Sequence, residues 1–257
     1  MSDYEQRFSG VQRLYGTTGL ARLRAAHVCV IGIGGVGSWS VEVLARSGVG
    51  AITLVDLDDI CVSNINRQIH SLTAQIGHAK VEAMAQRVRG ISADCVVQPR
   101  LEFFTEATAE KILSTRYDCV LDAIDSVANK SRLIAHCHQK KIPIVTCGGA
   151  GGRRDPTALR VADLSLASHD RLLKTVRVEL RKTHGFPRGD GKFGVEAVYS
   201  TERSKFPQPD GSICESRTET EGGSLRLNCE SGFGTAAFVM GAFGLVAASV
   251  VVRRLVG

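Results

Sequence analysis

The sequence predicts an α/β fold in which helices cover a mostly parallel β-sheet. Two observations predict it: short apolar runs alternate with helix-forming segments over residues 28–146, and a glycine-rich turn joins the first run to a helix. Parallel strands need crossover connections, which helices normally supply. With 257 residues, 44% hydrophobic and 23% charged, the chain is typical of a globular protein with its own core.

The elements follow in chain order, starting with a polar helical segment that ends near Ala26. The predicted strands are Val28–Ile31, Ile52–Val55, Cys95–Gln98, Cys119–Leu121 and Ile144–Thr146, and the predicted helices are Val36–Ser47, Lys80–Gly90, Thr108–Ser114 and Lys130–Lys140. In such sheets ligands bind beyond the carboxyl ends of the strands. Gly32, Asp56, Asp122 and the run Cys147-Gly148-Gly149 follow strands and are expected at that edge.

The pattern changes after Gly152. We expect one domain over 1–257, with a nucleotide-binding core at 1–150 and a substrate-binding and dimerisation part at 151–257. The latter begins with a helix at Asp170–Lys182, followed by long loops from His184 to Cys229.

Positive charge is concentrated in this second part. Residues 171–205 hold nine Lys or Arg and four Asp or Glu, so they carry +5 of the net charge of +6. A basic stripe on the predicted helix consists of Arg171, Lys174, Arg177 and Arg181. It favours an anionic partner such as nucleic acid, and the alternative is a solvated basic face.

The glycine-rich turn, Gly32-Ile33-Gly34-Gly35-Val36-Gly37, joins the first strand to the first long helix. Glycines let the backbone approach a phosphate, and the N–H groups of the helix N-terminus point at it. Asp56 follows the second strand, where a carboxylate accepts hydrogen bonds from ribose hydroxyls. The sequence therefore predicts a nucleotide site, with a ligand-free glycine turn as the alternative.

The residues after the second strand indicate which chemistry the nucleotide serves. Arg67 and Lys80 supply positive charge for a triphosphate, Asp125, with Asp122, supplies carboxylates for Mg²⁺, and Asn64 is suited to a phosphate or a metal-bound water. Nucleotidyl transfer needs such a set, whereas NAD-dependent hydride transfer does not. The alternatives for single residues are a helix cap at Asn64, a surface lysine at Lys80 and a strand end at Asp122.

These motifs resemble the ubiquitin-activating-type adenylyltransferases (the HesA/MoeB/ThiF family) over about residues 7–150. The matching positions are Gly32, Gly34, Gly35, Gly37, Asp56, Asp58, Asn64, Arg67, Gln68, Lys80, Asp122 and Asp125. The resemblance implies a Rossmann-like fold that binds ATP and Mg²⁺ and attaches AMP to a carboxylate. It places Asp56 and Asp58 at the ribose, Arg67 and Lys80 at the phosphates as catalytic residues, and Asp125 at the metal and the attacked phosphorus.

The sequence departs from the general pattern of this family at three places, and these departures narrow the resemblance to one branch of it. Gly10 stands where sulfur-carrier activators have an arginine that enters the partner subunit's site, Asp125 is followed by Ser126 rather than Asn, and the zinc-binding cysteine pairs are absent, so we expect no zinc. Arg13 is a weak candidate for the role of the missing arginine.

Four further motifs accompany these departures: Asp122-Ala-Ile-Asp-Ser-Val-Ala-Asn-Lys130, Cys147-Gly-Gly-Ala-Gly, Asp155-Pro156 and Val198-Tyr-Ser-Thr-Glu202. With them, the chain resembles one branch of the family over essentially its whole length, the tRNA threonylcarbamoyladenosine dehydratases. This branch uses ATP to cyclise the threonylcarbamoyl side chain of an adenosine beside the anticodon. It implies tRNA as substrate, a homodimer, and for some members a cysteine desulfurase and its sulfur acceptor as partners.

Three other functions stay open. Activation of a ubiquitin-like or sulfur-carrier protein may require a cysteine, for which Cys214 and Cys229 are the candidates. A scaffold role in sulfur transfer would use ATP only structurally. NAD-dependent oxidoreduction leaves Arg67, Lys80 and Asp125 together unexplained.

The location of the protein depends on one apolar segment. With eight cysteines and no recognisable signal peptide, we expect a cytoplasmic protein with reduced thiols. Phe233–Val252 contains no charged residue and is followed by Arg253 and Arg254, so it is long enough to cross a bilayer. We favour a helix buried in the domain, since the segment is rich in Gly and Ala; membrane association or a dimer interface are the alternatives.

Overall fold

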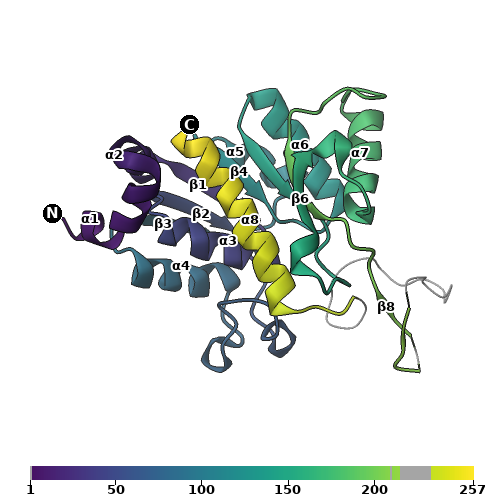
Figure 1. The fold of residues 1–257 in the computed structure, drawn as a ribbon, viewed down its shortest axis with the longest axis horizontal. Coiled ribbons are helices and arrows are strands. Elements are labelled where there is room, and N and C mark those ends of the chain that lie inside the picture. Colours follow the sequence, from purple (N-terminus) through teal and green to yellow (C-terminus); the bar gives the residue numbers. More distant parts are fainter. Residues whose placement is uncertain (1, 209, 215–232) are drawn as a thin grey trace.

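The computed structural model describes residues 2–208, 210–214 and 233–257 (Figure 1). At its centre is a seven-stranded sheet of order β3-β2-β1-β4-β5-β7-β6, and β6 is antiparallel to β7 while the other pairs are parallel. The strands are β1 (His27–Ile31), β2 (Ala51–Val55), β3 (Val96–Arg100), β4 (Cys119–Asp122), β5 (Ile144–Cys147), β6 (Leu159–Asp163) and β7 (Glu196–Ser200). A separate small hairpin pairs β8 (Phe206–Pro207) with β9 (Ile213–Cys214).

Helices cover both faces of this sheet. They are α1 (Asp3–Arg7), α2 (Ser9–Ala25), α3 (Gly35–Arg46), α4 (Lys80–Ile91), α5 (Glu106–Leu113), α6 (Val127–Lys140), α7 (Arg171–Thr183) and α8 (Ala237–Val256), with short 3₁₀ turns at Val62–Asn64, Thr73–Gln75, Pro156–Ala158 and Leu164–Leu166. Side chains of β1 alternate between two cores: Val28 and Val30 pack with α3, α4 and α8, and Cys29 and Ile31 pack with α5, α6 and α7. The α/β Rossmann-like architecture is therefore confirmed.

The strand register sets the position of the site. Ile31, the last residue of β1, lies opposite Val55 of β2 and Asp122 of β4. The carboxyl ends of these three neighbouring strands are therefore level. Gly32 and Asp56, the residues that follow β1 and β2, lie with Asp122 at one edge of the sheet, where ligands of such folds bind.

The first five strands and the predicted helices are confirmed with small shifts in their ends, such as β3 beginning at Val96 rather than Cys95. The prediction of long loops from His184 to Cys229 is wrong at β7, which lies between β5 and β6 in the sheet and has only its first residue partly exposed. Residues 209 and 215–229 of this range lie outside the described residues. Strands β8 and β9 fall in the same range, and β6 was not predicted. Distant pairing partners stabilise these strands, so their own short sequences carry little signal.

Helix α8 crosses the face of the sheet beside α3 (Figure 1). A Cβ on Gly244 would lie 2.6 Å from Cβ of Trp39 and 2.7 Å from the carbonyl oxygen of Val36, so a glycine lets the two helix backbones approach. Val239, Phe243 and other side chains of α8 enter the core. By length and composition alone α8 could cross a membrane, and 56% of its most apolar window is buried within the protein.

Candidate functional site

The glycine turn between β1 and α3 is tightly packed. Gly32 has φ +90°, and a Cβ on Gly37 would lie 1.8 Å from the carbonyl oxygen of Gly32, which excludes any side chain there. Gly34 is the N-cap of α3 and has no side chain to cap the helix. The N–H groups of the first helical turn are therefore left for an anion, as a phosphate-binding turn requires.

Asp56 holds this turn against β2. One carboxylate oxygen accepts the N–H of Ile33 at 2.6 Å, and the other accepts the N–H of Asp58 at 2.9 Å. Burial raises the pKa of Asp56, and the charge of Lys80 opposes that rise. Asp56 therefore shapes the turn, and each of its carboxylate oxygens has a second lone pair that can accept a further hydrogen bond.

Lys80 and Asp58 form an ion pair at the start of α4. Nζ of Lys80 lies 2.7 Å from the Asp58 carboxylate; the lysine side chain is buried, and the aspartate side chain is 53% exposed. The backbone N–H of Lys80 also donates to the carbonyl of Asp58 at 3.0 Å. The fold thus confines the ammonium group of Lys80 beside the carboxyl end of β2.

The segment from Asn64 to Gln68 is fixed to the start of α3. Trp39 Nε1 donates to the carbonyl of Arg67 at 3.0 Å, while the Arg67 guanidinium donates to the carbonyl of Ser63 at 2.6 Å. The side-chain oxygen of Asn64 accepts the N–H of Cys61 at 3.0 Å and shapes a turn. This contact is of the kind expected from the alternative interpretation of Asn64 as a helix cap. Gln68 is buried, and its Nε2 lies 4.0 Å from where a Cβ on Gly34 would stand.

The two carboxylates after β4 have different surroundings. Asp122 is fully buried, 2.8 Å from Nζ of Lys130, and it also accepts hydrogen bonds from Thr146 and from the N–H of Ile124. Asp125 is exposed and has no hydrogen-bond or ion-pair partner among the residues that the structure describes. These contacts give Asp122 a role in holding Lys130 and the loop, and they leave Asp125 as the carboxylate open to a metal ion or substrate.

The loop that carries Asp125 packs on the glycine turn. The carbonyl oxygen of Ala123 lies 2.8 Å from where a Cβ on Gly32 would stand, and the N–H of Ala123 donates to the carbonyl of Ile31 at 2.9 Å. Within the described part of the chain, no group of three or more His, Cys, Asp or Glu is placed to hold a metal ion. One carboxylate plus substrate phosphates is nevertheless a common Mg²⁺ environment.

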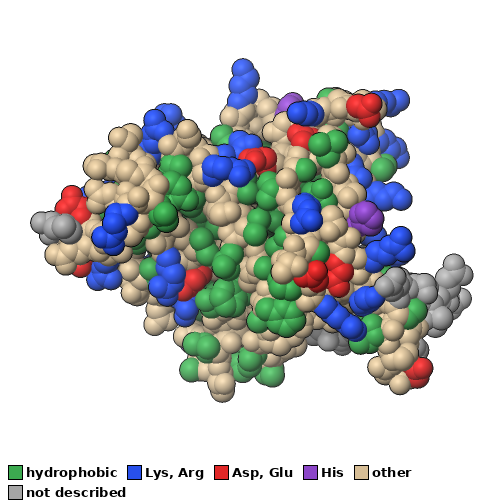
Figure 2. Space-filling model, in the orientation of Figure 1, with side chains coloured by type: hydrophobic (Ala, Val, Ile, Leu, Met, Phe, Trp, Pro, Cys, Tyr) green, Lys and Arg blue, Asp and Glu red, His purple; other side chains and the backbone are tan. Residues whose placement is uncertain are grey.

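The basic stripe on α7 separates into two kinds of residue. Arg171 and Lys174 are exposed, and Figure 2 shows Lys and Arg side chains along the edge of the molecule that α7 forms. Arg177 and Arg181 are partly buried and donate to backbone carbonyls, Arg177 to Ala167 at 2.5 Å and Arg181 to Pro187 at 3.0 Å. The latter two therefore hold neighbouring segments in place.

Sequence reasoning missed three buried polar groups near these positions. His70 is 3% exposed, and neither ring nitrogen has a hydrogen-bond partner among the described residues. Arg153 and Asp170 form an ion pair between side chains that are 1% and 0% exposed. The position of Asp170, directly before an amphipathic helix, was a usable N-cap signal. Of the two candidate cysteines, Cys214 is partly buried in β9 and Cys229 lies outside the described residues.

The sequence model of the ThiF family matches residues 7–257. The chain belongs to the ThiF family. It is 47% identical to the tRNA threonylcarbamoyladenosine dehydratase of Escherichia coli (strain K12), over 98% of this chain and 94% of that relative. It is also 47% identical to the dehydratase of Haemophilus influenzae, over 99% of this chain and 95% of that one.

Solved structures agree with this membership. The structure of the E. coli tRNA N6-threonylcarbamoyladenosine dehydratase in complex with ATP has a TM-score of 0.86 and 43% identity to this ThiF-family chain, covering 99% of it and 96% of the other. The complex of that enzyme with AMP has a TM-score of 0.87 and 44% identity, with the same coverage. The molybdopterin-synthase adenylyltransferase of E. coli is 31% identical, but over 53% of this chain and 54% of that relative.

Proposed function

We propose that this ThiF-family chain catalyses the ATP-dependent dehydration of threonylcarbamoyladenosine in tRNA. The observation that carries the proposal is the extent of the match. Similarity to the dehydratases covers 98% of the chain, whereas similarity to the molybdopterin-synthase adenylyltransferase covers 53%. The adenylyltransferase matches only about half of the chain, so the similarity to the dehydratases over the rest of it favours the tRNA substrate.

The chemistry has two steps. The carboxylate of the threonylcarbamoyl side chain attacks the α-phosphorus of ATP, and pyrophosphate leaves. An atom of the same side chain then attacks the activated carbonyl, gives up its proton and closes a ring. AMP leaves with one oxygen of the former carboxylate, so the side chain has lost the elements of one water. Ring closure within one side chain has an effective concentration of up to about 10⁵–10⁸ M, so no enzyme nucleophile is needed.

The residues around the glycine turn have matching tasks. The first turn of α3 binds phosphate, Asp56 and Asp58 bind ribose, and Arg67 and Lys80 stabilise charge at the attacked phosphorus. Supporting this assignment, Lys80 is buried beside Asp58 at the edge where the glycine turn lies. The ammonium group of Lys80 can move from Asp58 to a phosphate without a rearrangement of the backbone, so its positive charge is already in place for the reaction.

Magnesium is the metal that suits Asp125. The exposed, unpartnered carboxylate of Asp125 fits a Mg²⁺ ion held jointly with ATP phosphates, and such an ion would supply positive charge to the leaving pyrophosphate. No zinc is part of the proposal.

The tRNA backbone is proposed to bind along α7. Arg171 and Lys174 are the exposed cations of the first helical turns, and Arg177 and Arg181 keep the helix and its loops in place. Substitution of Arg171 and Lys174 by alanine should weaken tRNA binding and reduce the slope of log Kd against log salt by about one per lost phosphate contact. An unchanged slope would show that this face does not contact RNA.

A homodimer is proposed on the basis of exposed apolar side chains. Phe238 and Leu245 of α8 are 60% and 47% exposed, and Val62 and Leu72 in the loops after β2 are 67% and 56% exposed. Figure 2 shows hydrophobic side chains over α8 and at these loops. Light scattering of the wild type and of Phe238→Lys tests the proposal, because a monomeric wild type would exclude it. With α8 packed in this way we propose a cytoplasmic location.

The family resemblance alone supports a partnership with a cysteine desulfurase and its sulfur acceptor. Co-elution of the purified proteins tests it. Adenylation of a ubiquitin-like or sulfur-carrier protein is the second candidate function, supported by 31% identity to the molybdopterin-synthase adenylyltransferase over 53% of this chain.

Mass spectrometry tests the main proposal. The protein is incubated with ATP, Mg²⁺ and tRNA bearing threonylcarbamoyladenosine, and the digested tRNA is searched for that nucleoside minus one water. We expect ATP-dependent water loss that Asp125→Asn abolishes and that Asp190→Asn, at another exposed aspartate, does not. Absence of water loss, with pyrophosphate exchange that depends on a small carrier protein, would favour the second candidate function.

A further inference from the structure

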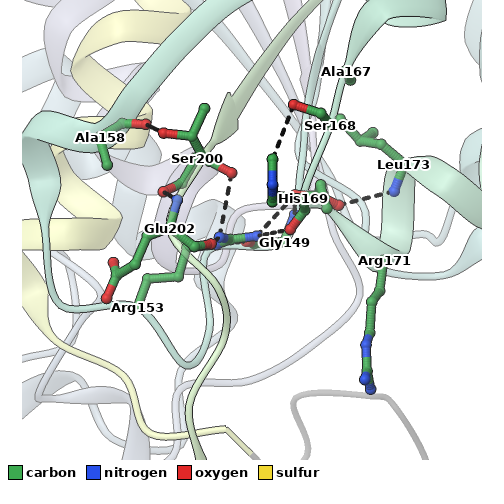
Figure 3. Close-up of polar contacts among 12 residues, drawn as sticks. Gly149, Arg153, Ala158, Ala167, Ser168, His169, Arg171, Leu173, Ser200 and Glu202 are labelled. Carbon is green, nitrogen blue, oxygen red and sulfur yellow. Dashed lines mark hydrogen bonds and ion pairs between the residues drawn. The ribbon is translucent and has the colours of Figure 1, made fainter. Parts of the chain in front are cut away.

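A buried arginine outside the nucleotide site joins several segments of the chain (Figure 3). Arg153 Nε donates to the carbonyl of Gly149 at 2.8 Å. Its Nη1 donates to the carbonyls of Ser200, at 3.3 Å, and Glu202. Its Nη2 donates to the carbonyl of His169 at 3.3 Å and to the Asp170 carboxylate at 3.4 Å. A guanidinium has five N–H donors. One side chain thus connects the loop after β5, the end of β7 and the start of α7.

Asp170 completes the connection to α7. One of its carboxylate oxygens accepts the N–H of Leu173 at 2.9 Å and caps the helix, and the other accepts the N–H of Gly149 at 2.9 Å besides contacting Arg153. Gly149 lies two residues beyond the end of β5, at the edge of the sheet where Gly32 and Asp56 also lie. The carboxylate therefore fixes the first turn of α7 to the nucleotide-binding edge.

The first turn of α7 also carries an exposed cation. Arg171 follows Asp170 directly, is exposed, and has its guanidinium carbon 5.0 Å from the ring centroid of Phe206 in β8. His169, whose carbonyl accepts from Arg153, is also exposed. RNA bound along α7 would thus reach the nucleotide edge past side chains whose backbone is held by Arg153 and Asp170.

We propose that Arg153 is a positioning residue for the tRNA reaction: with Asp170, it holds the start of α7 at the carboxyl edge of β5, so that RNA on α7 delivers its modified adenosine to the nucleotide site. This inference rests on the proposed function. A buried ion pair is weak evidence for stability as such, because apolar side chains of similar size often replace one without loss. The contacts of Arg153 and Asp170 therefore serve to fix the positions of the joined segments rather than to supply charge.

The test separates positioning from charge. Arg153→Lys keeps the positive charge but offers three donors from a single atom, which cannot serve all of these acceptors. We expect a fall of about 10²-fold in the single-turnover rate of dehydration at saturating tRNA, the cost of a misplacement of about 1 Å. ATP binding, tRNA Kd and the salt dependence of that Kd should stay at wild-type values, because the cations of α7 and the glycine turn remain.

Two further variants complete the experiment. Asp170→Asn keeps an oxygen for the Leu173 N–H but breaks the contacts to Gly149 and Arg153, so it should reproduce the slow turnover if Arg153→Lys does not fold. Arg254→Lys is the matched control: it alters an ion pair with Glu196 at the opposite end of β7 and should turn over at the wild-type rate.

The outcomes are distinguishable. Wild-type turnover in both Arg153→Lys and Asp170→Asn, with only a lowered melting temperature, would overturn the inference and leave a structural ion pair. The same holds if ATP binding falls in parallel with turnover. Failure of the wild-type protein to dehydrate tRNA, or unchanged tRNA binding in the Arg171→Ala/Lys174→Ala variant, would instead contradict the proposed function or its tRNA interface.

Discussion

Buried His70 makes the stability of this protein depend on pH in a predictable window. His70 is 3% exposed, and neither of its ring nitrogens has a hydrogen-bond partner among the described residues. Burial, reinforced by the positive charges of Lys80 and Arg87, lowers its pKa from 6.5 to about 3. The folded protein thus keeps the imidazole neutral at pH values where the unfolded chain binds a proton.

The sign and size of the effect follow from linkage. Between pH 6.5 and about pH 3 the unfolded state binds more protons, so the free energy of unfolding falls as the pH falls through this window. The limiting slope is about 1.4 kcal/mol per pH unit. Between pH 7.5 and pH 5, His70 should therefore destabilise the fold by about 2 kcal/mol.

Urea unfolding followed by the fluorescence of Trp39, the only tryptophan, measures this contribution. We compare the wild type with His70→Leu, in which an apolar side chain of similar size replaces a group without partners, so the two should be close in stability at pH 7.5. At pH 5 the variant should have gained about 2 kcal/mol relative to the wild type. His70→Gln, which is polar but does not titrate, should show the same relative gain. A difference between wild type and variants that does not change with pH would refute the reasoning.

The remaining predictions concern the nucleotide site and its support. Gly37→Ala should abolish ATP binding measured by calorimetry, because its Cβ would lie 1.8 Å from a carbonyl oxygen. Gly34→Ala should keep the melting temperature of the wild type, because the nearest atom of the described residues would lie 4.0 Å from its Cβ. Lys130→Met should lower the free energy of unfolding by about 3–5 kcal/mol, because it leaves the Asp122 carboxylate buried without its counter-charge, and adding Asp122→Asn should restore part of the loss. Lys80→Ala should slow single-turnover dehydration by about 10²–10³-fold with an unchanged circular dichroism spectrum, and a wild-type rate would remove Lys80 from the mechanism.

Local sequence was sufficient wherever an element carries its own signal. Val28–Ile31 is an uninterrupted apolar run before a glycine turn, and its strand, its turn and the following helix were predicted within one residue. The sequence at β7, Glu196–Ser200, is just as short but lies between glycine-rich and polar segments. Its strand conformation is fixed by pairing with β5 and β6. The partners of Glu196 in these strands, Val145 and Asp163, are 51 and 33 residues away in the sequence. Contacts between residues so far apart in the sequence produce no local hydrophobic periodicity from which the strand could be predicted.

The site shows the same division. The position of Asp56 beside the glycine turn follows from strand order, so the motif predicted it. Arg177 and Arg181 have helical spacing with Lys174, which suggested one basic stripe, but their guanidinium groups turn to carbonyls in segments on either side of α7. Arg153 shows no motif at all, since its acceptors are mostly backbone carbonyls, and any residue type supplies a carbonyl.

Helix α8 shows why composition left two interpretations open. A membrane-spanning helix and a helix buried in a core are both long and apolar, and small residues at close helix contacts occur in both environments. The structure shows the neighbours of this helix within the chain: Gly241 and Gly244 face Trp39 of α3, and Arg253 and Arg254 pair with Glu196 at the start of β7. The two arginines therefore join the helix to the sheet, and the two glycines, which lower the hydrophobicity of the helix, allow it to approach α3. The exposed Phe238 and Leu245 lie outside these contacts and are the part of α8 that the packing within one chain does not explain.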